Sequence, residues 1–262
     1  MENLSLSSHT LHPIGVFKSD QIHPYEAGRQ PDAHHSEGVI ELISGHNFEQ
    51  ALEEIETCPR LWILFSFHHN TQWRPQVLPP RGRDTKIGVF ATRSPYRPNA
   101  LGMSCVRFLR REGLKLYVAE ADLLNGSPVF DIKPYVAYAD SFPGVQPSWL
   151  ESAQAYDIIV SPLVEEQTAW LENHGVTQLR GFLRHQLEYE PTHSKKKRVR
   201  AESSGESYIL AYRTWRCRFQ LRAGSVHLIS IFSGYSEQDL LNTEDPYSDK
   251  GVHRLFLNLW RR

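Results

Sequence analysis

The segment from Gly88 to Gly102 carries two arginines that are placed for chemistry. Arg93 stands just before a Ser-Pro pair, and Arg97 directly precedes a proline. A residue before proline is disfavoured in helical backbone angles, so these pairs stiffen the loop and orient its side chains. An arginine held in this way presents a planar fork to a carboxylate or a phosphate. The alternative is that both guanidinium groups pair with acids or carbonyls of their own domain.

Two further stretches place polar groups at the ends of expected strands. His68 and His69 follow a long apolar run, and because neighbours on a strand point to opposite faces, they cannot easily grip one metal together. The interpretation we favour is that the backbone and one imidazole line a pocket; the alternative is a surface histidine. The turn Leu123–Pro128 has backbone groups that could read an adenine edge, or it is an ordinary hairpin turn.

Basic residues are concentrated although the formal net charge is −1. Between Arg74 and Arg111 there are nine lysines and arginines against one acid, Asp84, which favours a polyanion partner over that face. A second run, Lys195 to Arg200, is interpreted as an element that holds an RNA backbone. For both segments the alternative is a solvated charged surface or linker.

Several classes of protein are disfavoured by what the sequence lacks. There is no G-x-G, no phosphate-binding P-loop and no G-x-S-x-G, so the usual dinucleotide, NTPase and hydrolase signatures are missing. The three cysteines form no C-x-x-C pair, which predicts neither disulfides nor a zinc site. Neither a signal peptide nor a membrane span is expected. We therefore expect a protein of the reducing cytoplasm.

The elements that position these residues read as two domains. Short strands are expected at 13–17, 39–43, 61–67, 88–92, 104–109, 114–119 and 129–135, with one helix beginning at Asn47 and ending before Pro59. The 61–67 strand should be buried on both faces because it is continuously apolar. This pattern favours a mainly β first domain, an antiparallel barrel or sandwich, over residues 10–145.

The second domain, over residues 155–262, is expected to be a smaller α+β unit after a linker with Pro143, Gly144 and Pro147. Helices are predicted at 165–174 and 176–189, and a strand at 207–212. The segment 193–201 between them is expected to be a mobile basic loop. No role is evident for the apolar tail at 255–260.

Taken together, several stretches in order along the first domain resemble the TsaA-like family of tRNA methyltransferases. These stretches are Gly28-Arg29-Gln30-Pro31, Leu61 to Phe65 with His68, Trp73-Arg74-Pro75, Pro79-Pro80-Arg81, Gly88 to Pro95 with Arg97-Pro98-Asn99, Asp122-Leu123, and Asp131 to Tyr135. The resemblance implies an antiparallel β-barrel homodimer that uses S-adenosyl-L-methionine, bound near the subunit interface. It implies methylation of N6 of N6-threonylcarbamoyladenosine beside the anticodon of threonine tRNA.

The resemblance also assigns residues. The expected cofactor contacts are Gly28, Arg29, Gln30, His68, His69, Arg93, Met103, Leu123, Leu124, Asn125 and Gly126. The expected contacts with the tRNA anticodon loop are Arg74, Arg81, Arg97, Lys195, Lys196, Lys197 and Arg198. Because the target nitrogen is a weak nucleophile, a base is expected, with Asp131 as the candidate and Tyr135 behind it. No metal is expected.

Two positions depart from the pattern of that family. Gly28 stands where relatives have proline, which leaves the loop freer. Glu190-Pro191-Thr192-His193 stands where they often have Asp-Pro-Arg-Pro, so tRNA contacts there can differ. Two other classes stay open from the residues alone: a non-catalytic RNA-binding module, for which the basic segment suffices, and a metal hydrolase using His34, His35, His68, His69 and Asp131, against which the spacing argues.

Overall fold

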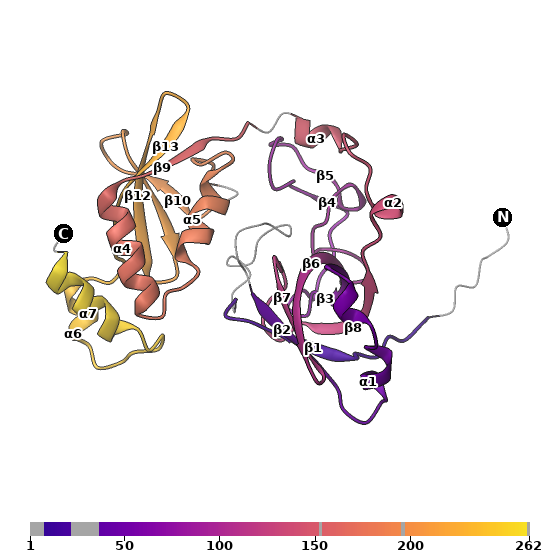
Figure 1. Ribbon diagram of the computed structural model, residues 1–262. Coiled ribbons are helices and arrows are strands. Elements are labelled where there is room, and N and C mark those ends of the chain that lie inside the picture. Colours follow the sequence, from indigo (N-terminus) through magenta and orange to yellow (C-terminus); the bar gives the residue numbers. More distant parts are fainter. Residues whose placement is uncertain (1–7, 22–36, 152–153, 195–196, 261–262) are drawn as a thin grey trace. The chain divides into compact units, whose positions relative to one another are not determined.

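The computed structural model describes residues 8–21, 37–151, 154–194 and 197–260 of the chain (Figure 1). It divides into two compact units. The first unit comprises Met1–Pro79 and Arg83–Pro147, and the second comprises Pro80–Gly82 and Ser148–Arg262.

The first unit is a closed antiparallel barrel, which confirms the predicted fold class. Neighbouring strands follow the order β1-β2-β7-β6-β3-β8. Their bounds are β1 Gly15–Lys18, β2 Gly38–Leu42, β3 Arg60–Ser66, β6 Leu101–Glu112, β7 Lys115–Ala119 and β8 Pro128–Pro134. One short helix, α2 (Ala137–Asp140), follows the last strand, and the next, α3 (Ser148–Glu151), already belongs to the second unit.

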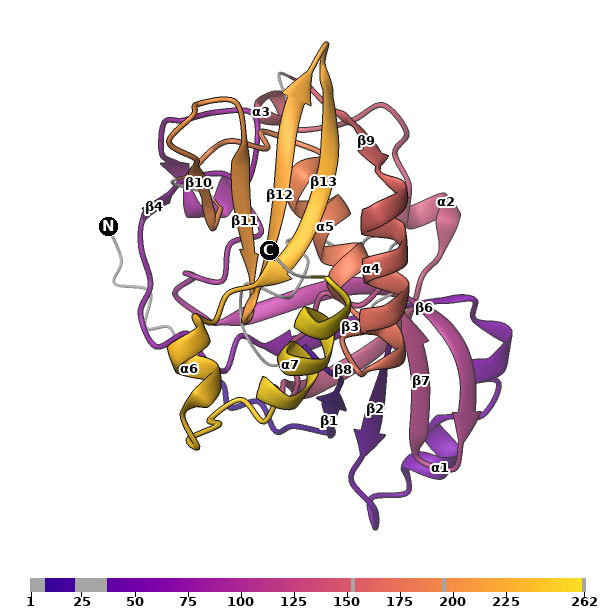
Figure 2. The same cartoon turned by 90° about the vertical axis from the view of Figure 1, so that its left-hand side faces the viewer.

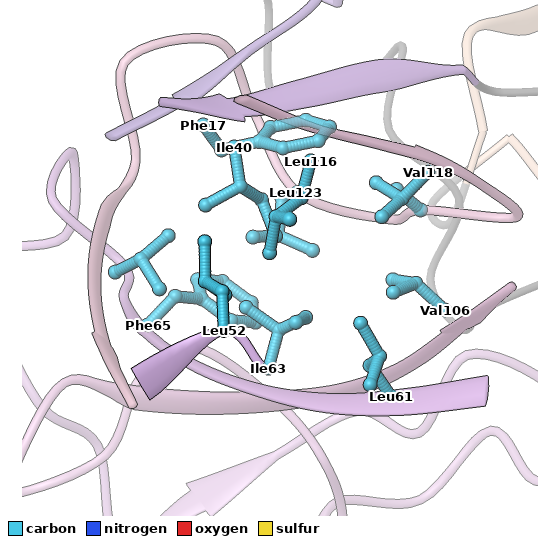
Figure 3. Packing of buried hydrophobic residues seen from close by; sticks show 12 residues of the cluster. Phe17, Ile40, Leu52, Leu61, Ile63, Phe65, Val106, Leu116, Val118 and Leu123 are labelled. Atoms are coloured by element: carbon cyan, nitrogen blue, oxygen red, sulfur yellow. The ribbon is translucent and has the colours of Figure 1, made fainter. Parts of the chain in front are cut away.

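The barrel interior is filled by aliphatic and aromatic side chains from every strand (Figure 3). On β3, Leu61, Ile63 and Phe65 are buried, whereas Trp62 and Leu64 between them are only half-buried. The expectation that this strand is buried on both faces was therefore wrong. A closed barrel has one interior, so successive residues alternate between that interior and the outer wall even where the sequence is apolar throughout.

The expected helix after Asn47 is shorter than its apolar spacing predicted. It is a single turn, α1 (Phe48–Ala51), followed by a 3-10 turn over Ile55–Thr57. Glu54 interrupts the helix because its backbone is left-handed, with φ 62°. Leu52 still packs into the barrel core, and Ile55 and Cys58 pack partly buried against it, so short turns and not a long helix bring these side chains to the core.

The expected barrel strand at 88–92 does not exist. Ile87–Gly88 (β5) pairs only with Gln76–Val77 (β4) in a small separate sheet, and Val89–Ala91 then forms a 3-10 turn. Val89 is buried, but Phe90 is 75% exposed. The apolar run is therefore a loop anchored by one valine, and the two arginines of this segment lie on that loop and not at a strand end.

The second unit contains a five-stranded sheet in the order β10-β11-β12-β13-β9, whose strands β10 to β13 lie side by side in Figure 2. Its strands are β9 Asp157–Val160, β10 Val199–Ala201, β11 Tyr208–Tyr212, β12 Trp215–Arg222 and β13 Ser225–Ser233. Its other helices are α4 Pro162–Asn173, α5 Leu179–Leu187, α6 Glu237–Leu241 and α7 Lys250–Leu259. These elements confirm the expected α+β class. The end of the expected basic loop is instead an edge strand, β10, held by pairing with β11 and by burial of Val199.

The apolar tail closes the core of the second unit. Phe256 of α7 is fully buried and its ring lies 5.0 Å from that of Trp215. Beside it, buried His253 stacks on Trp215 and is hydrogen-bonded to Ser233 and Thr214 at 2.8 and 2.9 Å. Among the helices that the structure describes, none has the length and apolar character needed to cross a bilayer.

Candidate active site

One end of the barrel gathers segments that are far apart in the sequence. The chain leaving β3 is joined to the arginine loop by three hydrogen bonds: Phe67 N to Ala100 O at 2.8 Å, the Asn70 side chain to Pro95 O at 2.5 Å, and Arg74 N to Tyr96 O at 3.1 Å. The predicted histidine segment and the predicted arginine loop therefore share one end of the barrel, as a single site requires.

The predicted turn at 124–127 joins the same end through His68. The His68 imidazole Nδ1 lies 3.4 Å from the Ser127 hydroxyl. At Gly126, where φ is +80°, an added Cβ would lie 3.7 Å from His68 Nε2. Burial, and then the adjacent charge of His69, lower the pKa of His68 below its usual value of 6.5. The imidazole is therefore neutral at neutral pH and can donate one hydrogen bond and accept another.

His69 was expected to point away from His68, and this expectation was wrong. The strand ends at Ser66, and the next residues turn back, with Asn70 N bonded to Phe67 O at 2.8 Å. Strand alternation therefore no longer applies, and the two imidazole centroids lie 4.0 Å apart. Among the residues that the structure describes, no group of three or more His, Cys, Asp or Glu side chains is placed to hold a metal.

The backbone of the turn is largely committed within the barrel. The N–H groups of Asn125, Gly126 and Ser127 donate to Gln21 O, Phe17 O and Leu124 O at 2.8, 2.8 and 3.1 Å. These three donors cannot read a base edge while those bonds hold. The Leu123 side chain belongs to the core and Leu124 is half-buried. Two acceptors of the turn are committed as well, since Ser127 O accepts from Phe17 N at 2.9 Å and Asn125 Oδ1 accepts from Ser19 N at 3.2 Å.

Gln21 is a residue that the sequence did not single out. It is buried at 5% exposure, and its side-chain Oε1 finds no hydrogen-bond partner among the residues described. A buried carbonyl oxygen without a donor costs free energy, so such an atom at a site is a candidate contact for a bound molecule. Its backbone carbonyl accepts a hydrogen bond from Asn125 N at 2.8 Å, and nothing in the local sequence marks this glutamine as buried.

The two arginines of the loop have different roles. Arg97 donates from Nη1 to Thr92 O at 2.8 Å and to Val89 O at 3.3 Å, so its guanidinium braces the loop. The Arg93 side chain is exposed. Arg74 lies over the ring of Tyr96, 4.3 Å from its centroid. Of the two loop arginines, Arg93 is thus the exposed one; its cofactor contact stays a prediction, as do tRNA contacts by Arg97 and Arg74.

Asp131 and Met103 lie on the outer wall of the barrel, on either side of β3. Cross-strand pairing puts Met103, Leu64 and Asp131 in one row. Met103 is 50% exposed. The Asp131 carboxylate pairs with Lys133 Nζ at 2.8 Å and accepts a hydrogen bond from Ile132 N at 2.9 Å.

A bulge in β8 places Asp131 there. Leu64 pairs with Asp131, but the next residue, Phe65, pairs with Val129, so one residue of β8 is skipped. Residues two apart on a regular strand share a face, but here Val129 is in the core and Asp131 is outside it. Tyr135 was expected behind Asp131, and its ring centroid lies 6.2 Å from that of Trp62. The charged partner of Asp131 is Lys133, which we had not predicted as a site residue. The sequence did carry a signal for this ion pair, since Asp131 and Lys133 have opposite charges and stand two residues apart on one strand.

The remaining predicted contacts are divided between the second unit and undescribed segments. Arg81, in the second unit, stacks on the Tyr189 ring at 4.1 Å. Lys197 donates its ammonium to Gln186 O and Tyr189 O, at the end of α5, while Arg198 is exposed. The other predicted contacts lie outside the described residues: Gly28, Arg29, Gln30, Lys195 and Lys196.

Known proteins with similar sequences and structures cover nearly the whole chain. The family model for the tRNA-methyltransferase O N-terminal domain matches residues 16–141. A tRNA (adenine(37)-N6)-methyltransferase of Escherichia coli K12 is 36% identical over 236 residues, which is 86% of this chain and 99% of that one. A putative S-adenosylmethionine-dependent methyltransferase of Pseudomonas aeruginosa is 38% identical over 163 residues, 56% of this chain and 71% of that one. A crystal structure of TrmO from P. aeruginosa superposes with a TM-score of 0.63 at 27% identity, covering 88% of this chain and all of that one.

Proposed function

Because this chain belongs to the tRNA-methyltransferase O family, we propose that it transfers a methyl group from S-adenosyl-L-methionine to N6 of adenine 37 in tRNA. The observation that carries the proposal is the 36% identity to the E. coli enzyme across almost all of both chains. We further propose that the substrate adenine is N6-threonylcarbamoyladenosine in the anticodon loop of threonine tRNA.

The residues at the end of the barrel fit this cofactor. Gln21 offers a buried carbonyl oxygen without a partner among the described residues, and neutral His68 can exchange hydrogen bonds without repelling a sulfonium. The exposed Arg93 suits the carboxylate of the methionine moiety, and Met103 gives an apolar contact. His69 and the Asn125–Gly126 turn would complete the site, together with Gly28, Arg29 and Gln30, which lie outside the described residues.

When bound, S-adenosyl-L-methionine supplies an electrophilic methyl group. The protein must hold the adenine N6 in line with that group, since alignment accounts for much of the rate of such a displacement. We propose that Asp131 Oδ2 accepts the N6 proton, which makes this nitrogen a better nucleophile. Lys133 now holds that oxygen and orients it. The bulge in β8 turns Asp131 outward, where a substrate can reach it.

The assignment of the two units follows from the same premise. We propose that the barrel binds the cofactor and carries out methyl transfer, and that the second unit binds tRNA. We expect a homodimer, for which the outer wall of the barrel offers exposed Leu101 and Met103, and we expect it in the cytoplasm with its substrate. Light scattering coupled to size exclusion tests the oligomeric state.

The decisive experiment is a methyl-transfer assay with the purified full chain. Threonine tRNA is supplied with and without the threonylcarbamoyl group, and the anticodon-loop nucleosides are analysed by mass spectrometry. Methylation at adenine N6 of position 37 is the expected result. Separately, S-adenosyl-L-methionine should raise the melting temperature, whereas a non-catalytic RNA-binding module would not respond. If no methyl group appears on either tRNA, the proposed activity is wrong.

A further inference from the structure

The sheet of the second unit has two chemically different faces. Along β12, Trp215, Cys217 and Phe219 are buried, while the alternate residues Arg216 and Arg218 are half-exposed. The helices pack on the buried set: the Phe182 ring of α5 lies 4.6 Å from Tyr212, the register partner of Trp215, and His253 of α7 stacks on Trp215 itself. The arginines therefore belong to the opposite face, which we call the arginine face.

Strand register extends the arginine face across the sheet. Arg200 of β10 pairs with Ile209, which pairs with Arg218. In the next row, Arg216 pairs with Phe232 of β13. Arg218 also lies over the Phe232 ring, with its guanidinium carbon 5.1 Å from the centroid. The arginine face is thus Arg200, Arg216, Arg218, Arg222 and Phe232, which come from β10, β12 and β13; the intervening β11 contributes Ile209 to the same row.

The guanidinium groups on this face are held by their edges. Arg218 donates from Nε and Nη2 to the Glu202 carboxylate at 2.9 and 2.9 Å. Arg216 donates from Nη1 to Trp215 O at 2.7 Å and to Arg213 O at 3.1 Å. Hydrogen bonds to the edge fix the plane of a guanidinium. Arg218 already lies over the Phe232 ring, and Gly234 lies against Arg216, where an added Cβ would be 2.7 Å from Cζ. Each group is therefore oriented in advance to stack through one flat face.

The composition favours a planar, negatively charged partner. From Arg198 to Ser233 there are six arginines, two glutamates and no lysine. A surface that serves only solubility has no need to exclude lysine, because both cations are hydrated at a surface, whereas arginine stacks on rings and pairs with phosphates through a fork. Sheet faces that combine aromatic rings and arginine planes are a recurrent way to bind the splayed bases of single-stranded RNA.

We infer that the arginine face binds unpaired nucleotides of the substrate tRNA, with bases stacking on the guanidinium planes of Arg216 and of Arg218, which Phe232 supports, and phosphates meeting Arg200 and Arg222. This inference rests on the proposed function, since it names the surface that holds the same substrate. It assigns RNA binding to the sheet, beyond the basic segment at 195–198.

The test measures RNA binding by the full chain and by variants that keep charge but lose planarity. The probe is a fluorescein-labelled RNA hairpin carrying the anticodon loop, followed by fluorescence anisotropy at several salt concentrations. Arg216→Lys with Arg218→Lys should weaken binding on the order of tenfold without changing the salt slope, since stacking is lost and charge is kept. Phe232→Leu should weaken binding similarly. Arg200→Gln, at an exposed edge position, should reduce the salt slope by roughly 0.7.

Arg180 provides the matched control. Like Arg218 it is ion-paired through its edge, to Glu165 at 2.7 Å and Glu172 at 3.1 Å, and its side chain is 43% exposed against 39% for Arg218. Because Arg180 lies on α5 and not on the sheet, Arg180→Lys should leave RNA affinity unchanged. Thermal melts establish whether each variant folds. If Phe232→Leu fails to fold, the exposed Arg200→Gln variant still tests the inference.

The inference is overturned if the variants of the arginine face bind the hairpin as tightly as wild type, or if a fully paired RNA duplex is bound as tightly as the hairpin loop. Methyl transfer by the wild-type enzyme is measured in parallel. If the wild-type enzyme transfers the methyl group but the variants bind RNA as tightly as wild type, only the inference about the arginine face is contradicted. If the variants bind RNA more weakly but the wild-type enzyme transfers no methyl group, only the proposed activity is contradicted.

Discussion

The carboxylate of Asp131 and the ammonium of Lys133 lie 2.8 Å apart on the outer wall of the barrel, next to the bulge that turned Asp131 out of the core. An exposed ion pair of this kind contributes little to stability, so its position is better explained by orientation of the carboxylate. That orientation leads to the first prediction.

Asp131→Asn should lower kcat by roughly 100-fold or more, because the amide cannot accept the N6 proton, while S-adenosyl-L-methionine affinity stays unchanged. Single-turnover methyl transfer and isothermal titration with the cofactor measure the two effects. Lys133→Gln removes the partner but keeps the carboxylate, and its loss should be much smaller. Equal losses in both variants would indicate that the pair is structural and that Asp131 is not the base.

Gly126→Ala should weaken cofactor binding as well as stability. Its φ of +80° strains any other residue, and the new methyl would stand 3.7 Å from His68 Nε2. Gly113 is the matched control: its φ of +59° imposes the same kind of strain, but no atom lies within 4 Å of an added Cβ. Both variants should lose about 1 to 2 kcal/mol of unfolding free energy. Only Gly126→Ala should weaken cofactor binding in a titration, and unchanged binding would remove this turn from the cofactor site.

Lys197→Met should destabilise the second unit. The ammonium satisfies Gln186 O and Tyr189 O near the end of α5, where a positive charge also meets the negative end of the helix dipole. A loss of about 1 kcal/mol in unfolding free energy is expected from urea denaturation. Lys197→Arg provides the comparison, since it keeps a positive charge and donor groups and should lose less stability than Lys197→Met. If RNA affinity falls in Lys197→Met without any loss of stability, the residue acts on the substrate instead.

Acid should destabilise the barrel through Glu120. Burial by itself would raise the pKa of this carboxyl, but hydrogen bonds from Arg60 at 2.5 Å and Arg107 at 2.9 Å outweigh it and lower the pKa below its usual 4.5. The ionised pair therefore stabilises the fold above about pH 4.5, and this contribution is lost as the pH falls through the lowered value. Urea denaturation across that range measures the loss. Glu120→Gln should be less stable at neutral pH and show a shallower acid dependence; an unchanged dependence would contradict this role.

Much of the site could be predicted because local chemistry marks it. The proline pairs around Arg93 and Arg97 indicate a stiff loop, and the structure contains that loop. The sequence could not predict which of the two arginines is held by the loop and which is exposed. That depends on the carbonyls of Val89 and Thr92, which accept hydrogen bonds from Arg97. They are placed to do so where a 3-10 turn replaces the expected strand. Gln21 was missed because the residues around it in the sequence do not indicate burial; its backbone carbonyl is bonded to Asn125, more than a hundred residues away.

The sequence by itself determined the class of fold and the family, since strand-length apolar runs, turn residues and the order of short motifs are all local along the chain. It also determined which residue types are present for binding an anion or accepting a proton. Tertiary structure alone decided which face each side chain occupies. A single skipped residue in β8 moved Asp131 to the outer wall, and the end of β3 at Ser66 brought His68 and His69 together. Strand register and bulges arise from pairing between distant segments, and a shift of one residue reverses a face, so no local pattern can fix them.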